Sequence, residues 1–325
     1  MKPAATTLLI LSMAIPKISI ADNLNRTHSS AIVLYGHSFL SNKQFAMSLS
    51  RETNLNVFDY ARGGSSSQEA AFISGGEAGL FSPQGGVIPA TGSVVMVPHG
   101  VMSEEGALWP GFYSPVIFSG VRGVLSSKKI SGEVKYIFKR DNPGQEIQVT
   151  NAIRAFPVNM TRVNSGTEKA GAVMSKQVRK IFIIWAGRNT ARGNISYIIR
   201  DIKSIASTAG ANDKYIVMPE FPYSNEVTGS QARTNINKLN EEIKNSFPEN
   251  YCVVNGLDAL QNFSSNYNKN NIEDLKDISK GVTPSTLRMD SLHPSDSVNN
   301  GASISGVDIN AKFIADCLRD KGWIK

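Results

Sequence analysis

The chain has few of the residues that bind metal ions or form disulfide networks. Its 325 residues include only two cysteines and four histidines, and no CxxC or HExxH motif occurs. Phosphate loops and dinucleotide fingerprints are also missing, so neither a metal site nor a cofactor is expected. Cys252 and Cys317 are compatible with one disulfide, as in an exported protein, or with two buried free thiols.

Clustered positive charge is also missing. The formal net charge is +7, but no run of five or more Lys or Arg occurs. A nucleic-acid-binding surface usually gathers basic residues in a stripe, so a nucleic-acid partner is not expected. The composition, 41% hydrophobic and 19% charged, is that of an ordinary globular protein.

No apolar stretch beyond the N-terminus is long enough to span a bilayer, so no transmembrane anchor is expected. The N-terminus itself has Lys2, the short apolar stretch Leu8–Ile15 and the small residues around Ala21. This pattern predicts a signal peptide over residues 1–21, cleaved near Ala21, and export to the periplasm or the medium. The alternatives are a first buried strand or a disordered start.

Apolar runs alternate with helical patterns through much of the chain. The runs that predict buried parallel strands are Ala31–Tyr35, Val57–Ala61, Ile181–Trp185, Tyr215–Pro219 and Tyr251–Asn255. Helical periodicity follows most of them, as in Ile198, Ile202 and Ile205. The alternation predicts a doubly wound α/β sandwich.

Residues 75–179 interrupt this alternation. Val134, Tyr136 and Phe138 alternate with polar or charged neighbours, and a turn follows at Asp141–Gly144. These features predict an inserted β-rich domain. The alternative is an elaborated loop that packs on the sheet without a core of its own.

Several polar residues stand just past the ends of predicted strands, where open parallel sheets bind ligands. Ser38 follows the first strand, Gly64 the second and Asn189 the third, whereas Asp290 and His293 precede the last helix. Ser38, His293 and Asp290 form a candidate nucleophile, base and orienting carboxylate. The N–H groups of Ser38 and Gly64 and the Asn189 amide form a candidate oxyanion hole. Taken singly, each residue is equally compatible with an ordinary turn or helix cap.

The segments YGHS, RGGSSS, WAGRN and DSLHP together resemble the four signature blocks of the SGNH (GDSL-like) hydrolase superfamily. His37 stands where that family often has Asp. The resemblance implies a three-layer, flavodoxin-like sandwich with a parallel sheet over residues 22–74 and 180–325, interrupted by the β-rich insertion. It also implies a carboxylic ester hydrolase that needs no cofactor.

These features together predict an exported serine esterase that cleaves small acyl esters. The acyl group is expected to be acetyl, on an O-acetylated glycan, and the partner is therefore an acylated small molecule or polysaccharide. Two alternatives remain: a polysaccharide O-acetyltransferase with the same three residues, or a non-catalytic glycan-binding protein on a hydrolase scaffold.

Overall fold

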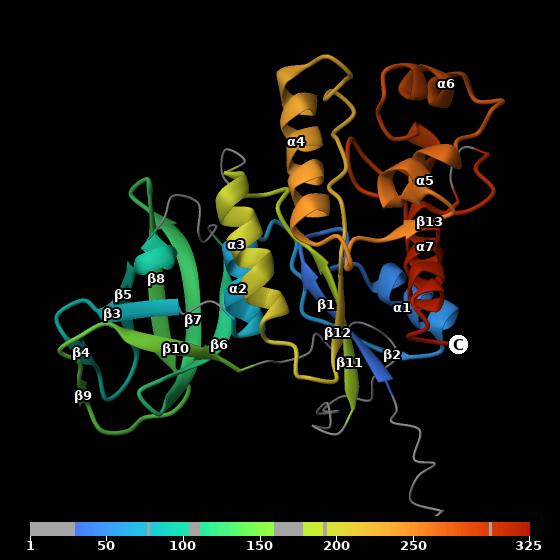
Figure 1. Cartoon of the computed structure of the whole chain (residues 1–325). Coiled ribbons are helices and arrows are strands. Elements are labelled where there is room, and N and C mark those ends of the chain that lie inside the picture. Colours follow the sequence, from blue (N-terminus) through green and yellow to red (C-terminus); the bar gives the residue numbers. More distant parts are fainter. Residues whose placement is uncertain (1–29, 77–78, 104–110, 159–177, 191–193, 299–300) are drawn as a thin grey trace, which may run out of the picture.

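A computed structural model describes residues 30–76, 79–103, 111–158, 178–190, 194–298 and 301–325. Two assemblies of strands organise these residues: a parallel sheet flanked by helices, and a closed barrel that lies to its left in Figure 1. The predicted signal peptide, residues 1–21, lies outside the described residues.

The parallel sheet has four strands in the order β12-β11-β1-β2. Their bounds are Ser30–Gly36 (β1), Asn56–Asp59 (β2), Arg179–Trp185 (β11) and Lys214–Val217 (β12). All neighbouring pairs are parallel, and β1 pairs with β11 along its whole length. The central strands are almost continuously apolar because both of their faces are covered.

Helices cover both faces of this sheet (Figure 1). The odd-numbered side chains of β1, such as Val33, share a core with helices α2, α3 and α4, and the even-numbered ones, such as Leu34, share a core with α1 and α7. The helices span Lys43–Thr53 (α1), Ser67–Ser74 (α2), Ile195–Ala206 (α3), Gln231–Ser246 (α4) and Gly306–Asp320 (α7).

Six antiparallel strands form the closed barrel, in the order β10-β3-β5-β8-β7-β6, with β6 pairing back to β10. They are Gly79–Pro83 (β3), Ser93–His99 (β5), Tyr113–Phe118 (β6), Val121–Ile130 (β7), Glu133–Arg140 (β8) and Ile153–Pro157 (β10). Closure leaves no unpaired sheet edge. Edge-to-face aromatic rings fill the interior, with Phe118 5.9 Å from Phe81 and 5.0 Å from Phe138 between ring centroids. The short strands Val87–Ile88 (β4) and Ile147–Gln148 (β9) pair beside it.

The barrel interior and one face of the parallel sheet belong to a single apolar cluster. Phe72 of α2 lies 5.8 Å from Phe112, just before β6, between ring centroids. Gly79, the first residue of β3, lies against the Phe72 ring, and a Cβ atom at position 79 would lie 2.3 Å from that ring. The barrel is therefore packed on the α2 side of the sheet. The division at residues 75–179 stays a prediction.

The fifth predicted strand, Tyr251–Asn255, does not join the sheet as a full strand. Only Tyr251 forms an isolated parallel bridge, to Val217. Asn255 and Gly256 then adopt positive φ angles of 52° and 79°, as an Asn-Gly hairpin turn requires. The chain therefore folds back as the two-stranded hairpin of β13 (Val253–Val254) and β14 (Leu257–Asp258).

A polar region follows the hairpin and leads to the last helix. Cys252, before the hairpin, forms a disulfide with Cys317 of α7. The region between contains helices α5 (Ala259–Ser265) and α6 (Ile272–Ser279) and the short 3₁₀ helix η4 (Ser285–Leu287). A further 3₁₀ helix, η2 (Gly100–Ser103), follows β5.

The fold class predicted from the sequence, a flavodoxin-like parallel sandwich, is wrong. Among the described residues, the largest sheet is the closed six-stranded antiparallel barrel, and the parallel sheet has four strands instead of five. The chain therefore has a mixed α and β fold. There are two physical reasons. The strands within residues 79–157, in which apolar and polar side chains alternate, form a barrel that shares the core of the parallel sheet. The turn at Asn255 and Gly256 directs the predicted fifth strand away from that sheet.

Candidate functional site

Ser38 lies in a sharp turn directly after β1. Gly36, the last residue of β1, has a φ of +150°, and a Cβ atom there would lie 1.9 Å from the Trp185 carbonyl oxygen. The His37 N–H donates a hydrogen bond to that same oxygen, at 3.1 Å. The close approach of β1 to β11 thus requires glycine at position 36. It leaves Ser38 half-buried at the carboxyl end of the sheet.

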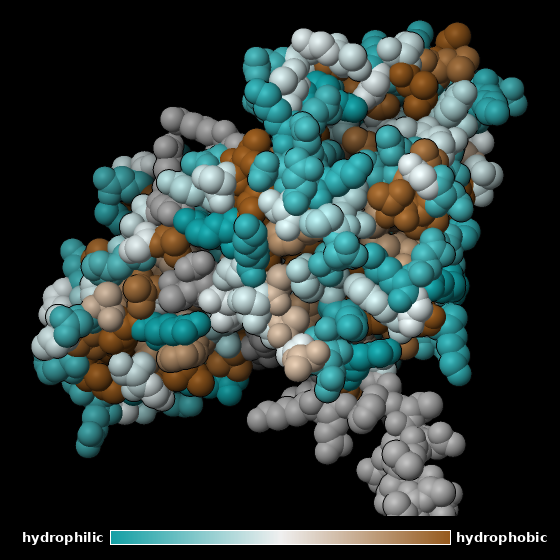
Figure 2. Space-filling model, in the orientation of Figure 1, coloured by the Kyte–Doolittle hydropathy of each residue, from teal (hydrophilic) through white to brown (hydrophobic). Residues whose placement is uncertain are grey.

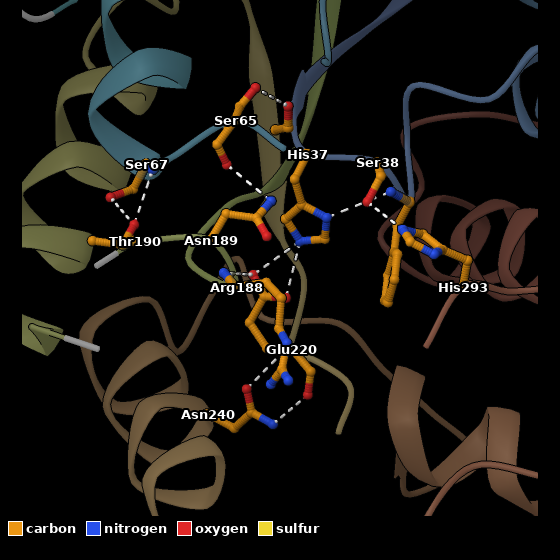
Figure 3. A network of polar contacts seen from close by, with 12 residues as sticks. His37, Ser38, Ser65, Ser67, Arg188, Asn189, Thr190, Glu220, Asn240 and His293 are labelled. Atoms are coloured by element: carbon orange, nitrogen blue, oxygen red, sulfur yellow. Dashed lines mark hydrogen bonds and ion pairs between the residues drawn. The ribbon is translucent and has the colours of Figure 1, made fainter. Parts of the chain in front are cut away.

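His293 and Asp290 meet Ser38 at this edge. The Nε2 atom of His293 lies 2.8 Å from the Ser38 Oγ atom (Figure 3), and its Nδ1 atom lies 2.7 Å from an Asp290 carboxylate oxygen. An imidazole that donates Nδ1–H to a carboxylate presents a free electron pair at Nε2. His293 is therefore oriented to accept the hydroxyl proton of Ser38.

The loop that holds His293 is braced at both ends. The Met289 N–H donates to the His293 carbonyl at 2.9 Å, and Arg288 pairs with Pro294 in an antiparallel bridge. The buried Arg288 guanidinium in turn forms a 2.6 Å ion pair with Asp277 of α6. These contacts fix the base by local hydrogen bonds and do not depend on the barrel.

Asp290 is held in its charged form. Its Oδ1 atom accepts hydrogen bonds from the N–H groups of Leu292 and His293, each at 2.8 Å. Partial burial acts to raise the pKa of the carboxyl, but these backbone hydrogen bonds and the His293 imidazole outweigh it. The pKa of Asp290 therefore lies below its ordinary value.

The predicted oxyanion donors lie in the neighbouring turns. The Asn189 side-chain amide donates to the Ser65 carbonyl at 3.2 Å (Figure 3). Gly64 lies in the exposed turn after β2 with a φ of +77°. That turn is tied to β1, because the Arg62 N–H donates to the Gly36 carbonyl at 3.0 Å. The role of Gly64, Asn189 and the Ser38 N–H in binding an oxyanion stays a prediction.

Sequence reasoning missed one residue of this region, Glu220. It follows β12 and is fully buried, and its carboxylate contacts the His37 imidazole at 2.9 and 3.1 Å (Figure 3). His37 is buried, and its Nε2 atom is directed into the protein, toward Glu220. The only signal in the sequence is an acidic residue at the end of an apolar run.

A cavity of about 840 Å³ opens beside Ser38. Two exposed methionines, Met47 and Met289, line it together with polar side chains that include Asn42, Lys43 and Asp296. Its size and mixed lining suit a small organic ligand such as a sugar residue.

None of the helices placed by the structure is both long and apolar enough to cross a membrane. Nor do the described residues include a group of three or more His, Cys, Asp or Glu side chains suited to hold a metal ion.

The chain is similar in sequence to a known phage protein. No protein-family model matches the chain. The chain is 34% identical over 298 residues to a tail spike protein of Salmonella phage epsilon15. The match covers 91% of this chain but only 27% of that protein, so the chain spans about a quarter of the length of its relative.

This similarity corrects the function predicted from the sequence. The relative is a phage tail spike protein, so the predicted function, a serine esterase that removes acetyl groups from a glycan, is wrong. The alternative function, a polysaccharide O-acetyltransferase, is overturned by the same similarity. The similarity also gives no support to the flavodoxin-like fold class. The resemblance of the four segments to SGNH blocks stays a prediction, as does export, because residues 1–21 lie outside the described part.

Proposed function

We propose that the chain is a region of a tail spike and binds polysaccharide on a bacterial surface. The observation that carries the proposal is the 34% identity to a tail spike protein along 91% of the chain. The chain has a buried core and an open cavity. A glycan is the ligand class that a tail spike meets at the surface of its host.

The cavity beside Ser38 suits such a ligand. A sugar ring has apolar C–H faces and a rim of hydroxyl groups, so it is bound by apolar side chains together with polar ones. Met47 and Met289 are 40% and 48% exposed there. Asn42, Lys43 and Gln44 add amide and ammonium groups to the same lining. In the space-filling view, most of the visible surface mixes hydrophilic and apolar residues (Figure 2).

Binding is tested with the whole chain and purified lipopolysaccharide from a panel of enterobacterial strains, Salmonella included. Surface plasmon resonance should show saturable binding to at least one of them. Met47→Gln and Met289→Gln together should weaken it about tenfold or more, by removing apolar contacts. Ile272→Gln changes an exposed apolar residue of α6, outside the cavity lining, and should bind as the wild type does. Equal affinity of all variants would place the glycan elsewhere, and no binding to any preparation would refute the proposal.

We also propose that the site is enzymatic, with Ser38 as its nucleophile. Specific support comes from the 2.8 Å contact to His293 and the 2.7 Å contact from His293 to Asp290. A serine hydroxyl with an oriented base attacks electrophilic carbon, and its proton passes to the imidazole. That the enzyme is a carboxylic ester hydrolase stays a prediction.

Nucleophilicity is tested separately from glycan binding. A fluorophosphonate probe reacts with activated serines: the serine oxygen bonds to phosphorus, fluoride leaves and the proton passes to the base. Intact-mass spectrometry should show one label per chain, located by peptide mapping at Ser38. A chain that binds glycan but takes no label would be a binding protein without this chemistry.

A further inference from the structure

The Glu220 carboxylate joins two turns of the candidate site. One of its oxygens accepts a hydrogen bond from the Arg188 N–H at 3.1 Å, and both oxygens contact the His37 Nε2 atom. His37 immediately precedes Ser38, and Arg188 immediately precedes Asn189. A single side chain therefore links the turn after β1 to the turn after β11 (Figure 3).

The hydrogen bonds define which atoms donate. The Phe39 N–H lies 3.4 Å from the Nδ1 atom of His37 and donates to it, so Nδ1 carries no proton. The proton of the neutral ring is then on Nε2, where it is donated to Glu220. Both groups that face the carboxylate, His37 Nε2–H and Arg188 N–H, are donors, and only an acceptor such as a carboxylate satisfies both.

Glu220 is itself rigidly placed. Its backbone N–H donates to the Asn240 side-chain oxygen at 2.7 Å, and its carbonyl accepts from the Asn240 amide at 2.9 Å. Asn240 belongs to α4, so the carboxylate is anchored to a helix on one face of the sheet.

We propose that Glu220 is a positioning residue, which sets where the Ser38 hydroxyl and the Asn189 amide stand relative to each other. It acts through His37 and through the Arg188 N–H and does not contact the substrate. The inference rests on the proposed role of Ser38 as a nucleophile. Nucleophilic attack requires one fixed geometry between the hydroxyl and the groups that stabilise the negative charge developing in the transition state. A loosened link between the two turns therefore slows the reaction without closing the cavity.

The test compares Glu220→Gln with wild type in fluorophosphonate labelling. A glutamine turns its NH₂ group toward one of the two donors and leaves that contact unpaired. The maximal labelling rate should fall about tenfold or more, while the probe concentration at half-maximal rate stays within about twofold. A merely structural role would lower the folded fraction, which circular dichroism at the assay temperature measures, and would leave the rate per folded molecule unchanged.

Asp213→Asn is the matched control. The Asp213 carboxylate also accepts two backbone N–H groups, from Lys180 at 2.7 Å and Gly210 at 2.9 Å. It lies at the opposite end of the strands, before β12. This variant should label at the wild-type rate per folded molecule.

A double-mutant cycle with His37→Asn tests the linkage. If Glu220 acts through His37, the two effects on the labelling rate are not additive, and the double variant is no slower than about the slower single one. His37→Asn also carries the test alone if Glu220→Gln does not fold. Wild-type rates in both folded single variants would refute the positioning role. An unlabelled wild-type chain would instead refute the nucleophile itself, so the two failures are distinguishable.

Discussion

The His293 Nε2 atom lies 2.8 Å from the Ser38 Oγ atom, although 255 positions separate the two residues in the sequence. Ser38 is placed by the end of β1, and His293 by a loop braced through Arg288 before α7. Two independently supported loops therefore converge on one hydrogen bond. The Asp290 carboxylate accepts a hydrogen bond from Nδ1, the other nitrogen of the His293 imidazole.

The Ser38→Ala variant should lose fluorophosphonate labelling and stay folded. Ser38 is half-buried, and its hydroxyl contacts the His293 imidazole, so its removal should change the free energy of unfolding by less than about 1.5 kcal/mol. Mass spectrometry and thermal unfolding measure the two effects. Ser41→Ala, a serine lining the same cavity, should keep full labelling. Labelling that persists in Ser38→Ala would assign the nucleophile to another residue.

Asp290 should make stability depend on pH in the acid range. Its pKa is lower in the folded chain than its ordinary value, so the unfolded chain binds the proton first as pH falls. The stabilisation is complete above the ordinary value of about 3.9 and is lost as pH falls through the folded value. The unfolding free energy of Asp290→Asn, measured by urea titration from about pH 7 to pH 2, should therefore approach that of the wild type at the acid end. A constant difference would show that the charge of Asp290 does not stabilise the fold.

Gly36 and Gly64 should differ sharply in tolerance to alanine. A Cβ atom at Gly36 would meet the Trp185 carbonyl oxygen at 1.9 Å, whereas one at Gly64 meets nothing within 4 Å. Gly36→Ala should lower the free energy of unfolding by more than about 3 kcal/mol or prevent folding. Gly64→Ala should lower the free energy of unfolding by only about 1–2 kcal/mol, the cost of its positive φ. Comparable losses in urea titrations would contradict the close approach of β1 and β11.

The disulfide between Cys252 and Cys317 should contribute measurably to stability. It closes a loop of 65 residues, and the chain-entropy model gives about 4 kcal/mol for a loop of that length. The Cys252→Ser, Cys317→Ser double variant should therefore unfold at a lower urea concentration than the oxidised wild type. Mass spectrometry after alkylation should find no free thiol in the wild type. Two alkylated cysteines in a protein never exposed to reductant would contradict the bridge.

Some of this arrangement was predictable from local patterns. The four strands of the parallel sheet lie within a residue or two of the apolar runs that predicted them, since a strand covered on both faces must be apolar along its length. Ser38, Asp290 and His293 were singled out from their positions after a strand and before the last helix. That these three side chains lie within hydrogen-bonding distance of one another depends on tertiary packing, so the sequence supported it only as an expectation.

Other features depend on contacts that a sequence does not display. Tyr251–Asn255 has the composition of a buried strand, but the turn at Asn255 and Gly256 diverts it into a hairpin. Alternation in residues 79–157 predicts strands, yet barrel closure depends on the long-range pairing of β6 with β10. Glu220 follows β12 and His37 follows β1, and β11 lies between these two strands in the sheet. The contact between Glu220 and His37 therefore depends on the strand order, which the sequence does not display.

The sequence alone determined where the chain is apolar, where it turns and which residues could act as nucleophile, base and orienting acid, because these depend on residue type and short-range spacing. The tertiary structure decided that six antiparallel strands close on themselves, that His37 turns inward to Glu220 and that Ser38 meets His293. Those outcomes depend on pairings between segments distant in sequence, whose free energies arise only when the whole core packs.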